Sequence, residues 1–111
     1  LIEVNVARED SKYGLYTEEV IPFLEEISAY PNIHVNGLMT IAPFVENPEE
    51  NRKYFRTLKQ LSLDIISKNI DNIDMNVLSM GMTNDYKVAI EEGATMVRVG
   101  TAIFGARNYT I

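Results

Sequence analysis

The sequence contains no cysteine and only one histidine, His34. Without cysteine, the chain has neither a disulfide framework nor thiolate ligands for a metal ion. A single histidine also excludes a multi-histidine metal site within one chain. The lack of cysteine fits an intracellular, reducing compartment, and we therefore expect a cytoplasmic protein.

An excess of positive charge and long apolar runs are also missing. The formal net charge is -6 at pH 7, and a surface of this sign repels DNA and RNA. No apolar run approaches the roughly 20 residues that a membrane-spanning helix needs. The first six residues, LIEVNV, lack the basic and apolar segments of a secretory signal. We therefore expect no nucleic-acid partner and no membrane.

The composition is that of a folded domain, with 46% apolar and 23% charged residues in 111 positions. This length is enough for one small domain but too short for a complete α/β barrel. The chain opens on Leu1, without an initiator methionine, and its first residues already have the pattern of a strand. We interpret the chain as a fragment of a longer protein.

The order of elements along the chain alternates between strands and helices. A helix is predicted from the Thr17 N-cap to Pro31, and a second from the Asn47 cap, with proline at its first position, to about Lys68. The second helix has an apolar stripe with a 3.6-residue period, formed by Tyr54, Phe55, Leu58, Leu61, Ile65 and Ile66. A third begins at a Thr83 or Asn84 cap and ends at Gly93. The predicted strands span 1–7, 35–41, 75–79 and 96–99, and a short last helix or turn begins at 102–105.

Such alternation is typical of α/β proteins with right-handed crossovers, a parallel sheet and helices outside it. Four units of this kind predict half of a TIM-type (β/α)8 barrel. Half a barrel has two open sheet edges and an uncovered inner face, so we expect copies of the fragment to associate.

Two segments that follow predicted strands have the character of anion sites. Ser79 offers a hydroxyl, and the backbone N–H groups from Met80 through Gly81 and Met82 to Thr83 approach a helix N-terminus. Gly100 and Thr101 repeat this combination after the last strand. A phosphate group between the two turns is one interpretation. Arg98 precedes the second turn by two residues and would point toward the same end of the barrel.

Simpler interpretations stand beside this one. Gly81 and Gly100 would then serve only tight turns, and Thr83 would only cap a helix. Arg98 would be a structural ion-pair partner. Lys12 and His34 would be surface residues. The methionines would fill the core; they are Met39, Met80 and Met82.

Three segments carry a resemblance to a known family: VNVAREDSKYG (4–14), GLMTI (37–41) and LSMGMTNDYKVAIEEGATMVRVGTAIFGAR (78–107). They resemble the C-terminal half of the pyridoxal phosphate homeostasis proteins, the YggS-like relatives of the alanine racemase N-terminal barrel. The resemblance covers nearly the whole chain, 1–111, and its last segment is specific to that family. It implies a (β/α)8 barrel that binds pyridoxal 5′-phosphate as a small-molecule cofactor.

The resemblance also implies roles for single residues. Ser79, Gly100 and Thr101 would hold the cofactor phosphate, with the backbone of 80–83 nearby. Arg98 would face the pyridine nitrogen, and a guanidinium there leaves that nitrogen unprotonated. Met39 would lie beside the ring, and Lys12 near the cofactor entrance.

The lysine that forms the Schiff base in this family lies in the N-terminal half, which this chain lacks, and Lys12 belongs to a different motif. We therefore expect no catalytic residue here and a protein that binds and buffers pyridoxal phosphate. The alternatives are a pyridoxal phosphate-dependent amino-acid (alanine) racemase and a regulatory protein with a vestigial pocket.

Overall fold

The computed structural model of the chain describes residues 1–10 and 13–99. Its elements alternate as the sequence predicts, with one additional 3-10 turn before the second helix. In chain order they are β1 (Ile2–Glu3), α1 (Thr17–Ile27), β2 (Val35–Met39), η1 (Pro48–Asn51), α2 (Arg52–Lys68), β3 (Ile73–Met82), α3 (Tyr86–Glu91) and β4 (Met96–Arg98).

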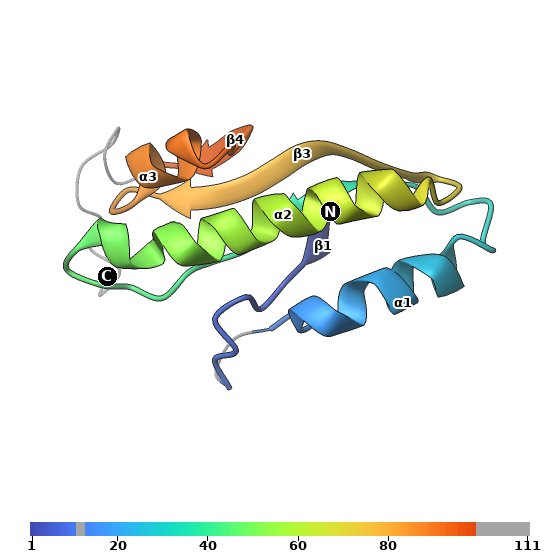
Figure 1. The fold of residues 1–111 in the computed structure, drawn as a ribbon, viewed down its shortest axis with the longest axis horizontal. Coiled ribbons are helices and arrows are strands. Elements are labelled where there is room, and N and C mark those ends of the chain that lie inside the picture. Colours follow the sequence, from blue (N-terminus) through green and yellow to red (C-terminus); the bar gives the residue numbers. More distant parts are fainter. Residues whose placement is uncertain (11–12, 100–111) are drawn as a thin grey trace, which may run out of the picture.

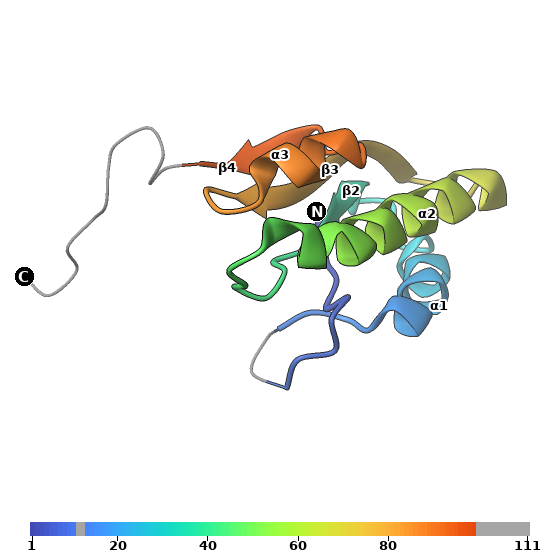
Figure 2. The same ribbon diagram turned by 60° about the vertical axis from the view of Figure 1, so that its left-hand side comes forward.

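The strands form one parallel sheet in the order β1-β2-β3-β4, so each strand pairs with its successor in the chain. Right-handed crossovers in such a sequential sheet place all connecting helices on one face. Figure 1 shows α2 running along β3, and Figure 2 shows α1, α2 and α3 following one another over the sheet. The predicted α/β class with a parallel sheet is confirmed. A complete barrel is not formed by the described residues.

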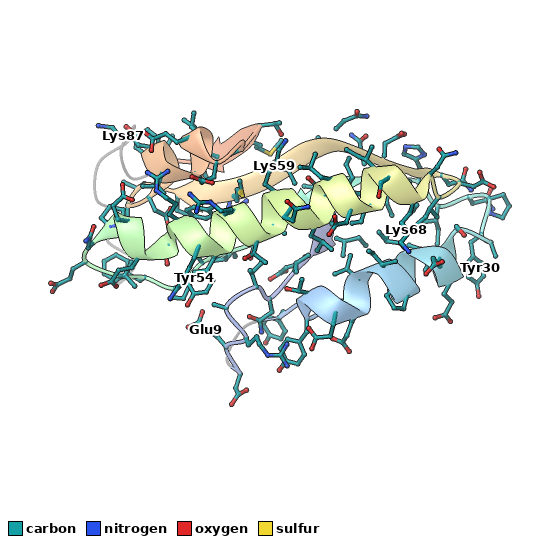
Figure 3. The ribbon with its side chains drawn as sticks, in the orientation of Figure 1. Glu9, Tyr30, Tyr54, Lys59, Lys68 and Lys87 are labelled. Carbon is teal, nitrogen blue, oxygen red and sulfur yellow. The ribbon has the colours of Figure 1, made fainter. Side chains whose placement is uncertain are left out.

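The hydrophobic core lies between the sheet and these helices. From α2 it receives Phe55, Leu58, Leu61 and Ile65, and this 3–4 residue spacing confirms the predicted apolar stripe. Ile66, which we expected in the stripe, is 56% exposed because it lies about 100° further around the helix. Figure 3 shows the labelled side chains that leave α2 on either side, such as those of Tyr54 and Lys59.

The helix ends match the sequence in part. Thr17 is the first residue of α1, and Tyr16 holds the N-cap position where we had expected Thr17. Asn47 does cap its helix, because its Oδ1 accepts a hydrogen bond from the Glu49 N–H at 3.1 Å. The capped turn is a 3-10 turn, however, and α2 begins only at Arg52.

The strands differ more from the prediction. β1 is limited to two residues, with Val4 added as a single bridge to Leu15. β3 instead spans ten residues, and it is extended because it pairs with strands on both sides. α3 begins after Asp85, so the predicted caps Thr83 and Asn84 were wrong. The helix predicted from 102 lies outside the described residues.

Helices α2 and α3 are joined by ion pairs at Glu92. Its carboxylate lies 2.7 Å from Arg52 Nη1 and 3.1 Å from Arg56 Nε, and its side chain is 13% exposed. Hydrogen bonds from Arg56 and Arg52 lower the pKa of Glu92 below its ordinary value of 4.5. The ionised carboxylate is therefore favoured in the folded state.

We expect Glu92→Gln to reduce the dependence of stability on acid. A lowered folded-state pKa adds stability that is complete above the ordinary value and is lost as the pH falls through the folded one. The variant should therefore be less stable than the unmodified protein at pH 7, and this difference should shrink between pH 7 and pH 3, as measured by urea unfolding. Glu26→Gln, at an exposed position of α1, is the matched control. An equal difference at both pH values would contradict the prediction.

Candidate functional site

The carboxyl ends of β2, β3 and β4 meet at one edge of the sheet, which we call the carboxyl edge. There the guanidinium of Arg98 on β4 reaches across to the two neighbouring strands. Arg98 Nη1 donates a hydrogen bond to Ser79 Oγ at 2.5 Å, and Nη2 donates to the Thr40 carbonyl at 3.2 Å. Both Ser79 and Thr40 are 1% exposed. The structure therefore brings Ser79 and Arg98 together, as we expected for neighbouring strand ends.

An irregularity in β3 sets the register of these residues. Ser79 lies opposite Met96, but Met82 lies opposite Arg98, so β3 has one more residue than β4 over this interval. Gly81 lies within it and has φ = +104°, a conformation that side chains other than glycine rarely adopt. Bulges of this kind often redirect side chains next to functional sites. From the sequence we had expected Gly81 in a turn, and the bulge was not predicted.

Thr40 ties the same cluster to β1. Its Oγ1 donates to the Val4 carbonyl at 2.6 Å, and its backbone N–H donates to the Ser79 carbonyl at 3.0 Å. Thr40 was not among the site residues predicted from the sequence. The available signal was a hydroxyl residue within the otherwise apolar segment GLMTI, at the end of its strand.

The donors of this cluster suit an anion. A serine hydroxyl has one proton to donate and two lone pairs that accept. Because Arg98 donates to the Ser79 oxygen, the Ser79 proton can be donated to a second partner. The two bonds to Ser79 and Thr40 use two of the five N–H groups of the guanidinium. A positive charge, a hydroxyl donor and further N–H groups are what a phosphate-bearing ligand requires.

The segment 80–83 is not the open turn that we expected. Met80 lies in β3, is fully buried and belongs to the core. A Cβ at Gly81 would lie 2.7 Å from the Ala89 Cβ, so α3 occupies the space next to this glycine. The backbone N–H of Met82 donates to Asp85 Oδ1 at 2.8 Å. This N–H is therefore engaged within the chain.

Of the remaining predicted site residues, the structure describes Met39 and Thr83 but not Lys12, Gly100 and Thr101. Met39 is partly buried and lies opposite Ser79 in the β2–β3 register. Thr83 lies in the loop between β3 and α3. Lys12, Gly100 and Thr101 lie outside the described residues, so the predicted second half of the phosphate site is not seen. Contacts of all these residues with a cofactor stay predictions.

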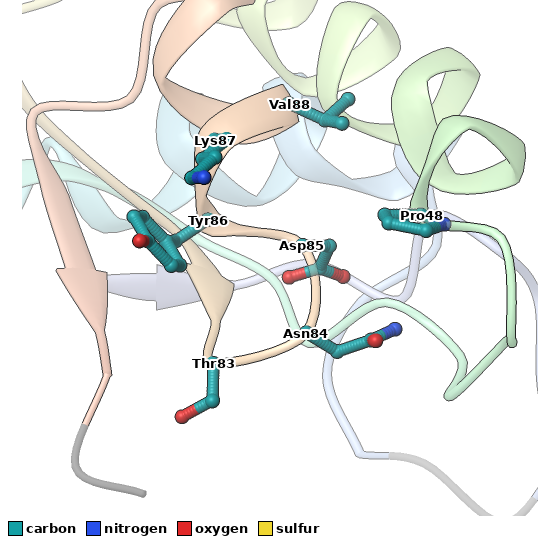
Figure 4. Close-up of a pocket in the computed structure, with 7 residues that line it drawn as sticks. All are labelled: Pro48, Thr83, Asn84, Asp85, Tyr86, Lys87 and Val88. Atoms are coloured by element: carbon teal, nitrogen blue, oxygen red, sulfur yellow. The ribbon is translucent and has the colours of Figure 1, made fainter. Parts of the chain in front are cut away.

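Hollows border the carboxyl edge. One of about 260 Å³ lies between the loop that follows β2 and the end of β3; it is lined by 41–44, Gly81, Met82, Asn84 and Asp85. A second, of about 510 Å³, adjoins Phe44, which is 85% exposed. Figure 4 shows a third, of about 440 Å³, between Pro48 and the loop that carries Asn84 and Asp85. In parallel α/β proteins, ligands bind at this end of the strands.

Two loops of the carboxyl edge are tied to each other by polar side chains that the sequence analysis missed. Asn51 Nδ2 donates to the Pro43 carbonyl at 2.8 Å and to Asp85 Oδ2 at 2.9 Å. Asn84 Nδ2 donates to the Val45 carbonyl at 2.7 Å. These bonds join the loop after β2 to the loop after β3.

The part of the chain that the structure describes contains neither a candidate metal site nor a candidate membrane-spanning helix. Residues 1–10 and 13–99 contain no group of three or more His, Cys, Asp or Glu side chains placed to hold a metal ion. Over the same residues, none of the helices combines the length and the apolar character needed to cross a bilayer.

Residues 1–108 match the family model described as "Alanine racemase, N-terminal domain". Three curated relatives, each called "Pyridoxal phosphate homeostasis protein", are similar over nearly the whole chain. The identity is 50% with the protein of Aquifex aeolicus, 41% with that of Haemophilus influenzae and 38% with that of Homo sapiens. The matches cover 98%, 99% and 99% of this chain, but only 47%, 46% and 41% of the relatives. The chain thus spans about half the length of these relatives.

Solved structures agree with this result. The chain is similar to PipY of Synechococcus elongatus PCC7942 without pyridoxal phosphate, with a TM-score of 0.83 and 29% identity. It is also similar to PipY with pyridoxal phosphate bound, with a TM-score of 0.77 and 27% identity. Each match covers 94% of this chain and 48% or 47% of PipY. The expectation that the chain is the C-terminal half of the barrel is not supported by these matches.

Proposed function

From the membership of this chain in the alanine racemase N-terminal domain family, we propose that it forms part of a pyridoxal phosphate-binding homeostasis protein. The relatives that cover nearly all of the chain carry this name, and a structural neighbour was solved with the cofactor bound. The same relatives offer no support for an amino-acid racemase. The proposed role is to bind and buffer the cofactor without a catalytic residue from this chain.

The observation that carries the proposal is the hydrogen bond between Arg98 and Ser79 at the carboxyl edge. The hydroxyl of Ser79 would donate its proton to the cofactor phosphate. Arg98 would hold that hydroxyl in place and present its guanidinium to the pyridine nitrogen. Because a guanidinium keeps its protons at all physiological pH values, the ring nitrogen would remain unprotonated. The cofactor itself supplies a reactive aldehyde and an electron-accepting ring when it is bound.

Other parts of the proposed site come from the family resemblance. Met39 would lie beside the ring, next to Ser79 in the sheet. Gly100 and Thr101 would complete the phosphate site, and Lys12 would lie near the entrance. The backbone of 80–83 would contribute through N–H groups other than that of Met82, which Asp85 already accepts.

We further propose that the chain supplies four consecutive βα units of an eight-unit barrel, on the pattern of a sequential parallel sheet. Reading the coding sequence on both sides of this chain tests this proposal, because strand and helix segments for the remaining four units should lie next to it.

Ser79→Ala is expected to lower the affinity for pyridoxal phosphate by about tenfold or more, because a hydrogen bond to a charged group is worth about 1.5–3 kcal/mol. Absorbance titration of the gene product that contains this chain would measure the dissociation constant. Ser62→Ala is the matched control, since Ser62 is also buried but its hydroxyl donates to the Lys59 carbonyl on α2. Equal affinities of the two variants would refute the role of Ser79.

A further inference from the structure

Asn51 is a fully buried polar residue at the end of the η1 turn, directly before α2. Its side-chain amide nitrogen donates to two acceptors on separate loops, the Pro43 carbonyl at 2.8 Å and Asp85 Oδ2 at 2.9 Å. Pro43 belongs to the loop after β2, and Asp85 belongs to the loop after β3. One amide group therefore spans the two loops that border the 260 Å³ hollow.

Asp85 transmits this contact to the end of β3. Its second carboxylate oxygen, Oδ1, accepts the backbone N–H of Met82 at 2.8 Å, and its own N–H donates to the Met82 carbonyl at 3.1 Å. The residue is 7% exposed, so these donors replace most of the water around its carboxylate. The chain of hydrogen bonds from Asn51 through Asp85 thus reaches Met82, which lies three residues after Ser79 in the sequence.

The Asn51 side chain satisfies only part of its own polar atoms. Its Oδ1 atom is buried and has no hydrogen-bond partner among the described residues. A buried polar atom without a partner costs free energy, and the two hydrogen bonds donated by the amide nitrogen offset that cost. What asparagine contributes is this donor, directed at both loops.

We propose that Asn51 is a positioning residue for cofactor binding, acting through Asp85 on the loop 82–85. This inference rests on the proposed function and assigns Asn51 no contact with the cofactor. Without the Asn51 amide, the buried carboxylate of Asp85 loses a donor and the two loops lose their shared tie. The end of β3 that carries Ser79 and Met82 is then held less firmly. Cofactor affinity falls as a result, because a binding site gains affinity when its hydrogen-bond donors are already held in place.

Asn51→Asp tests the proposal with almost no change of shape. The new carboxylate cannot donate to Pro43 or Asp85, and it places a second negative charge beside the Asp85 carboxylate. Asp85→Asn tests the same pair from the other side. The amide introduced by Asp85→Asn would still accept the Met82 N–H with its oxygen, but its nitrogen would face the Asn51 amide, donor against donor.

The double variant Asn51→Asp with Asp85→Asn exchanges donor and acceptor. Its side chains can again form the hydrogen bond between positions 51 and 85, although the bond to the Pro43 carbonyl does not return, and its net charge equals that of the unmodified protein. Asn76→Asp is the control, because it makes the same substitution at an exposed asparagine that is hydrogen-bonded to Asn36. Pyridoxal phosphate dissociation constants would be measured by absorbance titration of the gene product that contains this chain, with urea unfolding of each cofactor-free variant in parallel.

We expect each single variant to bind the cofactor about tenfold more weakly and the double variant to recover part of this loss relative to Asn51→Asp, because only the bond between positions 51 and 85 returns. The control should remain unchanged. Full affinity in either folded single variant, or no recovery in the double variant, would overturn the inference. If Asn51→Asp does not fold, Asp85→Asn and the double variant decide alone. Absence of cofactor binding by the unmodified protein would instead refute the proposed function itself.

Discussion

Arg98→Glu is expected to weaken pyridoxal phosphate binding by at least about 100-fold. The substitution removes the donor that holds the Ser79 hydroxyl and places a carboxylate next to the Thr40 carbonyl. It also sets a negative charge beside the proposed position of the cofactor phosphate. Two like charges about 4 Å apart near a protein surface repel by about 4 kcal/mol, more than the roughly 2.7 kcal/mol that corresponds to 100-fold.

The measurement is an absorbance titration at several pH values. Any cofactor that still binds should have a protonated pyridine nitrogen, which would appear as a new pH dependence of its spectrum. Lys68→Glu, at an exposed position in the last turn of α2, makes the same change of net charge away from the carboxyl edge. If the two variants bind the cofactor equally well, Arg98 is not part of the site.

Phe55→Ala is expected to lower the free energy of unfolding by about 3–5 kcal/mol, the usual cost of removing a fully buried phenylalanine. Phe55 is completely buried in the central helix α2, within the core that the sheet and the helices share. The loss combines the transfer free energy of the ring with the cavity that remains. Against a typical total stability of about 5–15 kcal/mol, such a loss populates unfolded chains.

Urea unfolding of the gene product that contains this chain would measure the effect. Leu63→Ala is the control on the same helix, because Leu63 is 45% exposed and should cost less than about 1 kcal/mol. A loss below about 1 kcal/mol for Phe55→Ala would show that this face of α2 does not carry the core.

The agreement between sequence and structure was uneven for physical reasons. The α2 stripe and the capping role of Asn47 follow from local rules of spacing and hydrogen bonding, and both were confirmed. The predicted extent of β3 was too short. A strand continues as long as neighbouring strands pair with its backbone, and that pairing depends on other parts of the chain. The predicted start of α3 was wrong because the N-cap position is held by Asp85, which makes no side-chain capping bond and instead accepts the N–H of Met82, outside the helix.

The candidate site shows the same division. Ser79 and Arg98 could be selected from the sequence because they follow strands whose carboxyl ends meet at one edge. The sequence did not predict that these two residues form a direct hydrogen bond, that Thr40 contributes its carbonyl, or that Met80 lies in the core. These depend on the bulge at Gly81 and on the register between strands whose paired residues lie 16 to 40 positions apart in the chain.

The sequence by itself determined the alternation of strands and helices, the parallel sheet and the family, because periodicity, capping residues and motifs are local properties of the chain. Only the tertiary structure decided which polar groups meet. Asn51 and Asp85 are 34 positions apart, and Arg98 and Thr40 are 58 apart. Contacts at such separations form only once the helices have packed and the strands have paired, since packing and pairing fix which loops and strand ends lie side by side.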